Sequence, residues 1–175
     1  MYAIGHSNRT LEFLVGLLLG YEVEHLVDVR TIPRSRHNPQ FNGDTLPADL
    51  KNVGIAYTHM PGLGGLRRAQ KDSLNQGWEN ASFRGYADYM QTPEFDENLE
   101  KLIALAQKNV VAFMCAEAVP WRCHRSLIAD ALTIRGIPVY QIMSRVSAPR
   151  HALNPMADVH GTNLTYPPTQ GLLKI

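Results

Sequence analysis

One apolar run constrains the fold of this chain more than any other feature. Residues 110–115, Val-Val-Ala-Phe-Met-Cys, form an uninterrupted apolar stretch that a polar loop follows. A run of this length is typical of a strand that is covered on both faces, as strands of parallel sheets are. Parallel strands need long crossover connections, which are usually helices. The run therefore predicts an α/β protein with helices on both faces of its sheet.

The rest of the chain alternates in the same way. Short apolar runs predict further strands at residues 2–5, 25–29, 55–59 and 138–142. Apolar residues at helical spacing predict helices over residues 11–20, 44–53, 83–90 and 93–106, and around 127–132. Residues 61–80 predict a long irregular loop. This order is typical of a mostly parallel, open, doubly wound sheet of Rossmann-like type.

The length favours one domain. A chain of 175 residues is close to the usual size of a single domain, and it shows no internal repeat and no linker. We expect one α/β domain over residues 1–175, with a core over 1–143. The weakly patterned residues 144–175 predict an irregular C-terminal extension, with a hairpin around Gly161.

Net charge and cysteine content indicate the compartment and the kinds of partner to expect. The formal net charge of +1 gives no general attraction to nucleic acid or to membranes. Two cysteines do not make a disulfide scaffold, which favours a reducing compartment. The N-terminal residues lack a signal-peptide pattern, and no apolar run is long enough to cross a bilayer. We therefore expect a cytoplasmic protein with no membrane partner.

The loops that follow the strands hold most of the residues able to do chemistry. Right-handed crossovers place all these loops at one edge of a parallel sheet. The predicted binding residues there are His6, Ser7, Asn8, Arg9, Asp28, Arg30, Arg34, Arg36, His59, Cys115, Trp121, Arg122 and Arg125. We expect them to share one cavity, because ligands of open α/β sheets bind at this edge.

The arginines indicate what that cavity binds. The chain has 12 arginines and 5 lysines, and most of the arginines fall in these loops. Guanidinium groups bind carboxylate and phosphate through paired hydrogen bonds, and free N–H groups at the helix start near Cys123 would add to this. We expect an arginine-rich cleft for an anionic small molecule. The alternative is that the arginines are solvated or pair with nearby acids.

Three residues of the loop after residue 115 are candidates for catalysis. Cys123 lies next to His124 and Arg125 at a predicted helix start, and all three features lower a thiol pKa and favour a nucleophile. Glu117 is a candidate acid or base, or the partner of Arg122 or Arg125 in an ion pair. The predicted catalytic set is Cys123, His124 and Glu117. Cys115 is expected to stay a buried thiol, although a reversible disulfide with Cys123 remains an alternative.

The sequence was also considered for cofactor binding and for nucleic-acid binding. No cofactor is predicted, because the histidines and cysteines show no tight spacing of a structural zinc site. Zinc or heme remains an alternative. Trp78, Phe83, Tyr86 and Tyr89 could stack bases, but their helical spacing favours core packing.

The motifs taken in order resemble those of the DUF488 family, a group of bacterial and archaeal proteins named for having no assigned function. The matching segments are residues 5–9, 27–30, 33–36, 38–41, 63–65, 83–90, 115–117, 120–125, 151–155 and 164–167. The resemblance implies a single α/β domain whose signature residues are those of the loops above. It implies no particular reaction.

These observations lead to one functional hypothesis and two alternatives. The hypothesis is a small enzyme acting on an anionic substrate, such as a nucleotide or another phosphate compound, at a Cys/His/Glu centre. The first alternative is a binding module for nucleic acid or nucleotides that catalyses nothing. The second is a thiol-based redox sensor, or a sensor of zinc or heme.

Overall fold

The protein is built around a five-stranded parallel sheet. The computed structural model describes residues 1–168. The strands follow the spatial order β3-β2-β4-β1-β5, and every pairing between them is parallel. Their bounds are β1 (Tyr2–Gly5), β2 (His25–Asp28), β3 (Ala56–His59), β4 (Val111–Cys115) and β5 (Tyr140–Gln141). The apolar run at residues 110–115 contains β4, which confirms the predicted strand and places it at the centre of the sheet.

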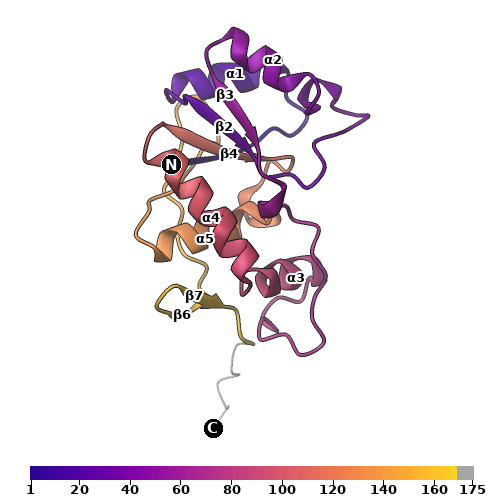
Figure 1. The fold of residues 1–175 in the computed structure, drawn as a ribbon, viewed down its shortest axis with the longest axis vertical. Coiled ribbons are helices and arrows are strands. Elements are labelled where there is room, and N and C mark those ends of the chain that lie inside the picture. Colours follow the sequence, from indigo (N-terminus) through magenta and orange to yellow (C-terminus); the bar gives the residue numbers. More distant parts are fainter. Residues whose placement is uncertain (169–175) are drawn as a thin grey trace.

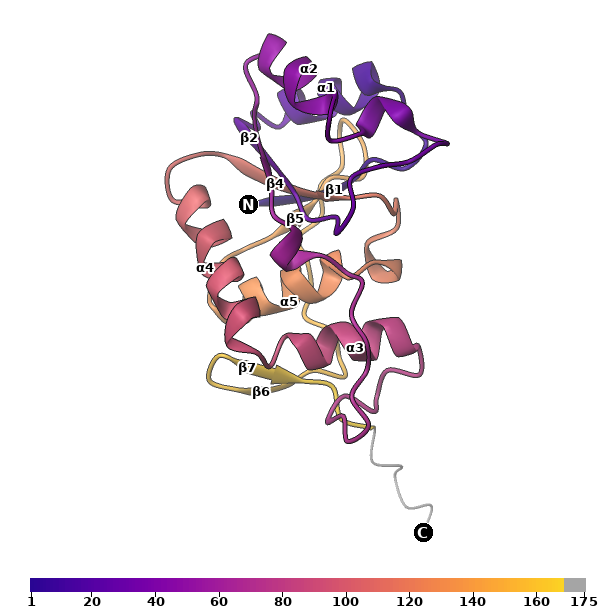
Figure 2. The same cartoon turned by 45° about the vertical axis from the view of Figure 1, so that its right-hand side comes forward.

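Helices cover both faces of this sheet (Figures 1 and 2). On one side lie α1 (Leu11–Gly20) and α2 (Leu46–Asn52), and on the other α3 (Ala81–Tyr89), α4 (Pro93–Ala106) and α5 (Arg125–Ile134). Alternate residues of β4 enter separate cores. Ala112 and Met114 pack with α1 and α2, whereas Phe113 and Cys115 pack with the other three helices. The doubly wound α/β fold is confirmed, and the Cys115 side chain points toward the face that α5 covers.

Threonine side chains cap the start of two helices. Thr10 and Thr92 cap α1 and α4 by accepting hydrogen bonds from the backbone N–H groups of the third residue beyond each. Helix α1 extends through Gly20, and Glu22 then takes a positive φ of 54° in the turn that follows.

The C-terminal extension is ordered where the structure describes it. Its strands β6 (Asp158–His160) and β7 (Asn163–Thr165) form the predicted hairpin around Gly161. The predicted tail residues 169–175 lie outside the described residues. The extension is tied to α5 through Asp130, whose two carboxylate oxygens accept from Tyr166 Oη and from His151 Nε2, each at 2.7 Å.

We predict that Tyr166→Phe loosens this attachment. The Tyr166 side chain is buried, and losing its bond to a buried carboxylate should lower the free energy of unfolding by about 1–3 kcal/mol. Urea unfolding followed by circular dichroism measures the change. Tyr140→Phe is the matched control, because no hydrogen bond of its hydroxyl is found within residues 1–168. Equal losses in the two variants would contradict the assigned role.

Three short 3-10 helices lie in the connecting loops, namely η1 (Pro39–Phe41), η2 (Pro61–Leu63) and η3 (Pro120–Arg122). The last of these forms part of the loop from β4 to α5 that the sequence singles out. Within residues 1–168, no helix has both the length and the apolar character that crossing a bilayer requires.

Candidate functional site

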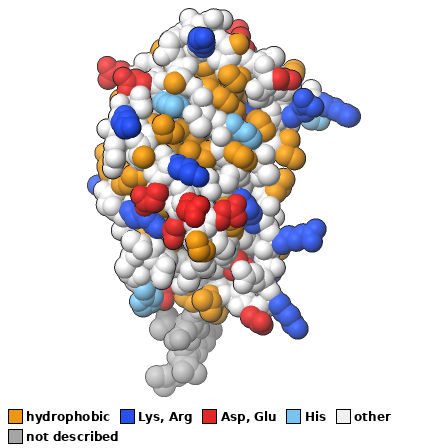
Figure 3. Space-filling model, viewed as in Figure 1, with side chains coloured by type: hydrophobic (Ala, Val, Ile, Leu, Met, Phe, Trp, Pro, Cys, Tyr) orange, Lys and Arg blue, Asp and Glu red, His pale blue; other side chains and the backbone are white. Residues whose placement is uncertain are grey.

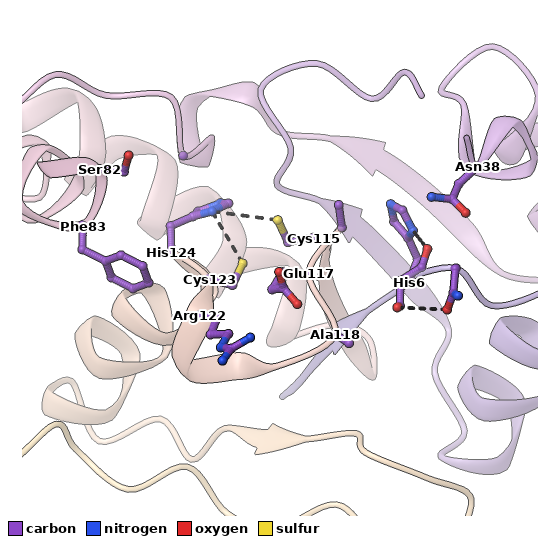
Figure 4. Close-up of a pocket in the computed structure, with 14 residues that line it drawn as sticks. His6, Asn38, Ser82, Phe83, Cys115, Glu117, Ala118, Arg122, Cys123 and His124 are labelled. Atoms are coloured by element: carbon purple, nitrogen blue, oxygen red, sulfur yellow. Dashed lines mark hydrogen bonds between the residues drawn. The ribbon is translucent and has the colours of Figure 1, made fainter. Parts of the chain in front are cut away.

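A cavity of about 550 Å³ opens at the carboxyl edge of the sheet (Figure 4). Eight of the predicted site residues line it, namely His6, Ser7, Asn8, Cys115, Glu117, Arg122, Cys123 and His124. They come from the loop after β1 and the loop from β4 to α5. The cavity therefore lies where parallel-sheet topology places a ligand site.

Two thiols and one imidazole meet in this cavity. Both cysteines are free, and each is more than nine-tenths buried while still lining the cavity. His124 Nδ1 lies 3.9 Å from Cys115 Sγ and 3.7 Å from Cys123 Sγ. The three atoms all lie within 4.8 Å of one another. Figure 4 shows the His124 ring directed at both sulfurs.

The His124 ring is held in this orientation from three sides. Its Nε2 lies 3.2 Å from the carbonyl oxygen of Val29, which can only accept, so Nε2 carries the hydrogen. Tyr86 packs on the ring with centroids 4.9 Å apart. A Cβ at Gly65 would lie 2.5 Å from His124 Nδ1, so only glycine leaves room for the ring. In the neutral ring, the lone pair of Nδ1 therefore faces the two sulfurs.

Contacts within the cluster act on the pKa values of the two thiols in opposite directions. A hydrogen bond from Cys123 lowers the pKa of Cys115, against the opposing effect of burial, and His124 lowers it further. The same hydrogen bond, together with burial, raises the pKa of Cys123. The assignment of Cys123 as the nucleophile stays a prediction, and the contact of His124 with both sulfurs makes Cys115 a second candidate.

Two of the predicted anion-binding arginines form hydrogen bonds to other groups of the protein. Arg30 donates from Nε to Asp28 Oδ1 at 2.9 Å and from Nη2 to the Phe41 carbonyl at 2.7 Å. Arg125, 1% exposed, donates to the carbonyl oxygens of Glu117 and Ala118 at 2.9 and 3.2 Å. Asp28, a predicted site residue, is fully buried against Arg30. None of these three residues lines the main cavity, although Arg30 lines an adjoining pocket of about 310 Å³ together with Cys115 and His124.

Other predicted residues also lie away from the cavity. Arg9 caps the Gly5 carbonyl, Arg34 is exposed beside Asp44, and Arg36 is exposed. On the edge strand β3, His59 bonds to the Arg30 carbonyl at 2.8 Å. Trp121 is 69% exposed and lines a separate cavity of about 270 Å³. The expected convergence of arginines is not found within residues 1–168.

Arg122 is the one arginine that lines the main cavity in the described part of the chain. It is exposed, and its side chain forms no ion pair or hydrogen bond within residues 1–168. Glu117 faces the same cavity, and its carboxylate accepts from the Val119 N–H at 3.3 Å. Neither of its predicted ion pairs, with Arg122 or with Arg125, forms in this part of the structure. One cation and one anion are thus available to a ligand beside the sulfurs.

The helix start offers less to an anion than expected. The Arg125 N–H points to Cys123 Sγ at 3.5 Å, and the Ser126 N–H donates to the Cys123 carbonyl at 2.9 Å. These groups are therefore already engaged. Any anion in the cavity depends on side chains more than on the helix end.

His6 lines the cavity as a neutral ring. Its Nδ1 donates to the Ser7 carbonyl at 2.7 Å, and its Nε2 accepts from Arg30 Nη1 at 3.2 Å. Burial lowers the pKa of His6, which matches this neutral state. Because both ring nitrogens are occupied, His6 positions its neighbours and has no free nitrogen for proton transfer.

Sequence reasoning missed six residues of the lining, namely Asn38, Gly65, Ser82, Phe83, Ala116 and Ala118. Ser82 and Phe83 lie in the first turn of α3, which begins at Ala81, two residues before the predicted start. Asn80 was the available signal, because its side chain caps this helix through the Ser82 N–H. Gly65 gave no such signal, and the structure shows that it makes room for the His124 ring.

Comparison with known proteins gives one family. A family model described as a domain of unknown function, DUF488, matches residues 10–132. Neither the curated proteins nor the solved structures give a match. The matched segment runs from the start of α1 into α5 and contains Cys115, Glu117, Cys123 and His124. The chain belongs to the DUF488 family.

Proposed function

We propose that the protein is a small enzyme that acts on an anionic substrate, with the Cys115–Cys123–His124 cluster as its reactive centre. The observation that carries this proposal is the meeting of two thiols and an imidazole in one cavity that also holds Arg122. The cavity lies at the edge of the sheet where open α/β proteins bind their ligands. Both cysteines are free thiols, which fits the reducing compartment expected from the sequence.

The geometry suggests a role for each side chain. Cys115 supplies the nucleophilic sulfur, and His124 Nδ1, at 3.9 Å, takes the thiol proton. Cys123, whose sulfur lies within 4.8 Å of Cys115 Sγ, stabilises the Cys115 thiolate and so lowers its pKa. Arg122 binds the anionic group of the substrate. The Glu117 carboxylate faces the same cavity and can pass a proton to or from the leaving group.

A nucleic-acid-binding module has less support. Such a module needs basic side chains gathered along one surface. On the face drawn in Figure 3, Lys and Arg side chains occupy several separate places. The aromatic residues considered for base stacking are mainly core residues, since Tyr86 is fully buried and Tyr89 is 8% exposed. We therefore favour a small-molecule substrate.

Alkylation with reagents of different charge tests the anion site. Iodoacetate is anionic and iodoacetamide is neutral, so the ratio of their rates at Cys115 reports the attraction of an anion to the sulfur. In chelator-treated protein at fixed pH, Arg122→Ala should lower this ratio by roughly fivefold, as expected for losing about 1 kcal/mol of charge attraction. Mass spectrometry identifies the modified cysteine.

Arg36→Ala is the matched control, because Arg36 is exposed and lies outside the cavity. Its rate ratio should equal that of the wild type. An unchanged ratio in Arg122→Ala would contradict the proposed anion site. Turnover is tested with chromogenic aryl phosphates, sulfates and carboxylates, and activity that survives in Cys115→Ser would exclude Cys115 as the nucleophile.

A further inference from the structure

We propose that Cys115, Cys123 and His124 bind one zinc ion, and that this ion controls access to the thiols. The three side chains are the only group of three or more potential ligands found close together within residues 1–168. Their donor atoms, two Sγ and one Nδ1, lie within 4.8 Å of one another in the absence of any ion. The sequence placed all three in one loop region but showed no tight spacing of a structural zinc site.

The distances fit tetrahedral zinc. Zinc binds thiolate sulfur at about 2.3 Å and imidazole nitrogen at about 2.0–2.1 Å, which places nitrogen and sulfur about 3.6 Å apart at a tetrahedral angle. The two nitrogen–sulfur distances in the protein are 3.7 and 3.9 Å. The nitrogen–sulfur distances therefore need to change by only a few tenths of an ångström. The two sulfurs, which lie within 4.8 Å of each other, need to be about 3.8 Å apart around the ion.

The environment of His124 supports the same conclusion. A metal-binding histidine usually donates its other ring N–H to a carbonyl or carboxylate, which fixes the ring and directs the free lone pair at the metal. His124 Nε2 makes this contact with the Val29 carbonyl at 3.2 Å. Gly65 leaves the space that the ring needs beside the sulfurs. The nitrogen is thus oriented before any ion arrives.

The donor set selects the metal. Two thiolates and one imidazole suit zinc, whereas magnesium and calcium prefer oxygen ligands. Two thiolates also balance the charge of a divalent ion, which favours its binding at this largely buried place. Any thiol protons still present pass to solvent as the ion binds.

The fourth coordination position faces the cavity. No fourth histidine, cysteine or acidic side chain joins the cluster in the described part of the chain. Three protein ligands with an open position are typical of zinc sites that exchange water or a ligand, whereas structural sites are closed by four. Glu117 and Arg122 line the same cavity and would face whatever occupies that position.

Zinc binding and nucleophilic attack by the same thiols then exclude each other. A sulfur that donates its lone pair to zinc is a weaker nucleophile, so the loaded protein should react slowly with alkylating reagents. This consequence rests on the proposed function, because it assigns zinc as the regulator of the same thiols. The binding of the ion does not depend on it.

Cobalt(II) and zinc test the site in the intact protein. One equivalent of Co²⁺ should produce thiolate-to-cobalt charge-transfer absorption with the visible bands of tetrahedral cobalt, and one equivalent of Zn²⁺ should abolish both. Cys123→Ser and His124→Gln should each weaken zinc binding by more than about 100-fold, since even supporting residues are worth 10–100-fold. His160→Gln is the control, because His160 is an exposed histidine beside Asp158, and it should change nothing.

Two results would overturn the inference. One is the absence of thiolate-to-cobalt absorption in the reduced wild-type protein. The other is zinc binding of equal strength in the wild type and in both ligand variants. If zinc fails to bind while alkylation still depends on Arg122, the proposed function stands alone. If zinc binds but Arg122 has no effect on alkylation of the metal-free protein, the metal site stands and the proposed function fails.

Discussion

Gly5→Ala is expected to prevent the chain from reaching the fold described above. A Cβ at Gly5 would lie 1.8 Å from the Glu117 carbonyl oxygen and 2.8 Å from Arg125 Nη1. Overlap with a backbone atom cannot be relieved by turning a side chain. Both sides are also fixed, because β1 pairs with β4 and β5, and Arg125 holds the Glu117 carbonyl at 2.9 Å.

The expected loss exceeds about 4 kcal/mol, which is a large part of the stability of a domain of this size. The measurements are soluble yield, far-ultraviolet circular dichroism and urea unfolding. Gly20→Ala is the matched control, since nothing lies within 4 Å of a Cβ at this position and it ends helix α1. That change should stabilise the protein by up to about 1 kcal/mol.

A Gly5→Ala variant as stable as the wild type would show that the loop after β4 can move away from β1. The arrangement of Cys115 and Cys123 would then be less fixed than the structure indicates, since Arg125 holds that loop in place. Stability and thiol geometry are therefore linked through Gly5.

Much of the fold could be predicted because its signals are local. The run at residues 110–115 and the threonine caps of α1 and α4 act through neighbouring residues and backbone groups. The short strand β5 was harder, because Pro138 begins the predicted run and only Tyr140–Gln141 pair in the sheet. Strand ends depend on partners that sequence alone does not display.

The sequence predicted where the site lies in the fold but not which side chains point into it. Parallel topology placed the loops at one edge, and eight predicted residues line the cavity there. The direction of each side chain depends on tertiary contacts, which sequence position does not give. Arg30 and Arg125 turn inward to bond with Asp28 and with backbone carbonyls, whereas Arg122, from the same loop as Arg125, stays free. The closeness of Cys115 to His124 likewise follows from packing across the loop.

Asp28→Ala is expected to destabilise the protein by about 3–5 kcal/mol, the usual cost of leaving the partner of a buried ion pair uncompensated. Asp28 is fully buried and Arg30 is 7% exposed. The carboxylate accepts from the Arg30 backbone N–H at 3.0 Å, from Arg30 Nε and from Tyr57 Oη at 2.8 Å. Without this carboxylate, the Arg30 guanidinium and the Tyr57 hydroxyl lose their hydrogen-bond acceptor. Urea unfolding measures the resulting decrease in the free energy of unfolding.

Asp44→Ala is the matched control, because its pair with Arg34 spans 3.6 Å between side chains that are 60% and 74% exposed. An exposed ion pair contributes little, so this variant should stay within about 0.5 kcal/mol of the wild type. The double variant Asp28→Ala/Arg30→Met should recover part of the loss, because it also removes the uncompensated charge. A double variant less stable than Asp28→Ala would instead assign the main role of Arg30 to its contacts with His6 and the Phe41 carbonyl. The Asp28–Arg30 pair would then act chiefly by positioning His6, which lines the cavity after β1.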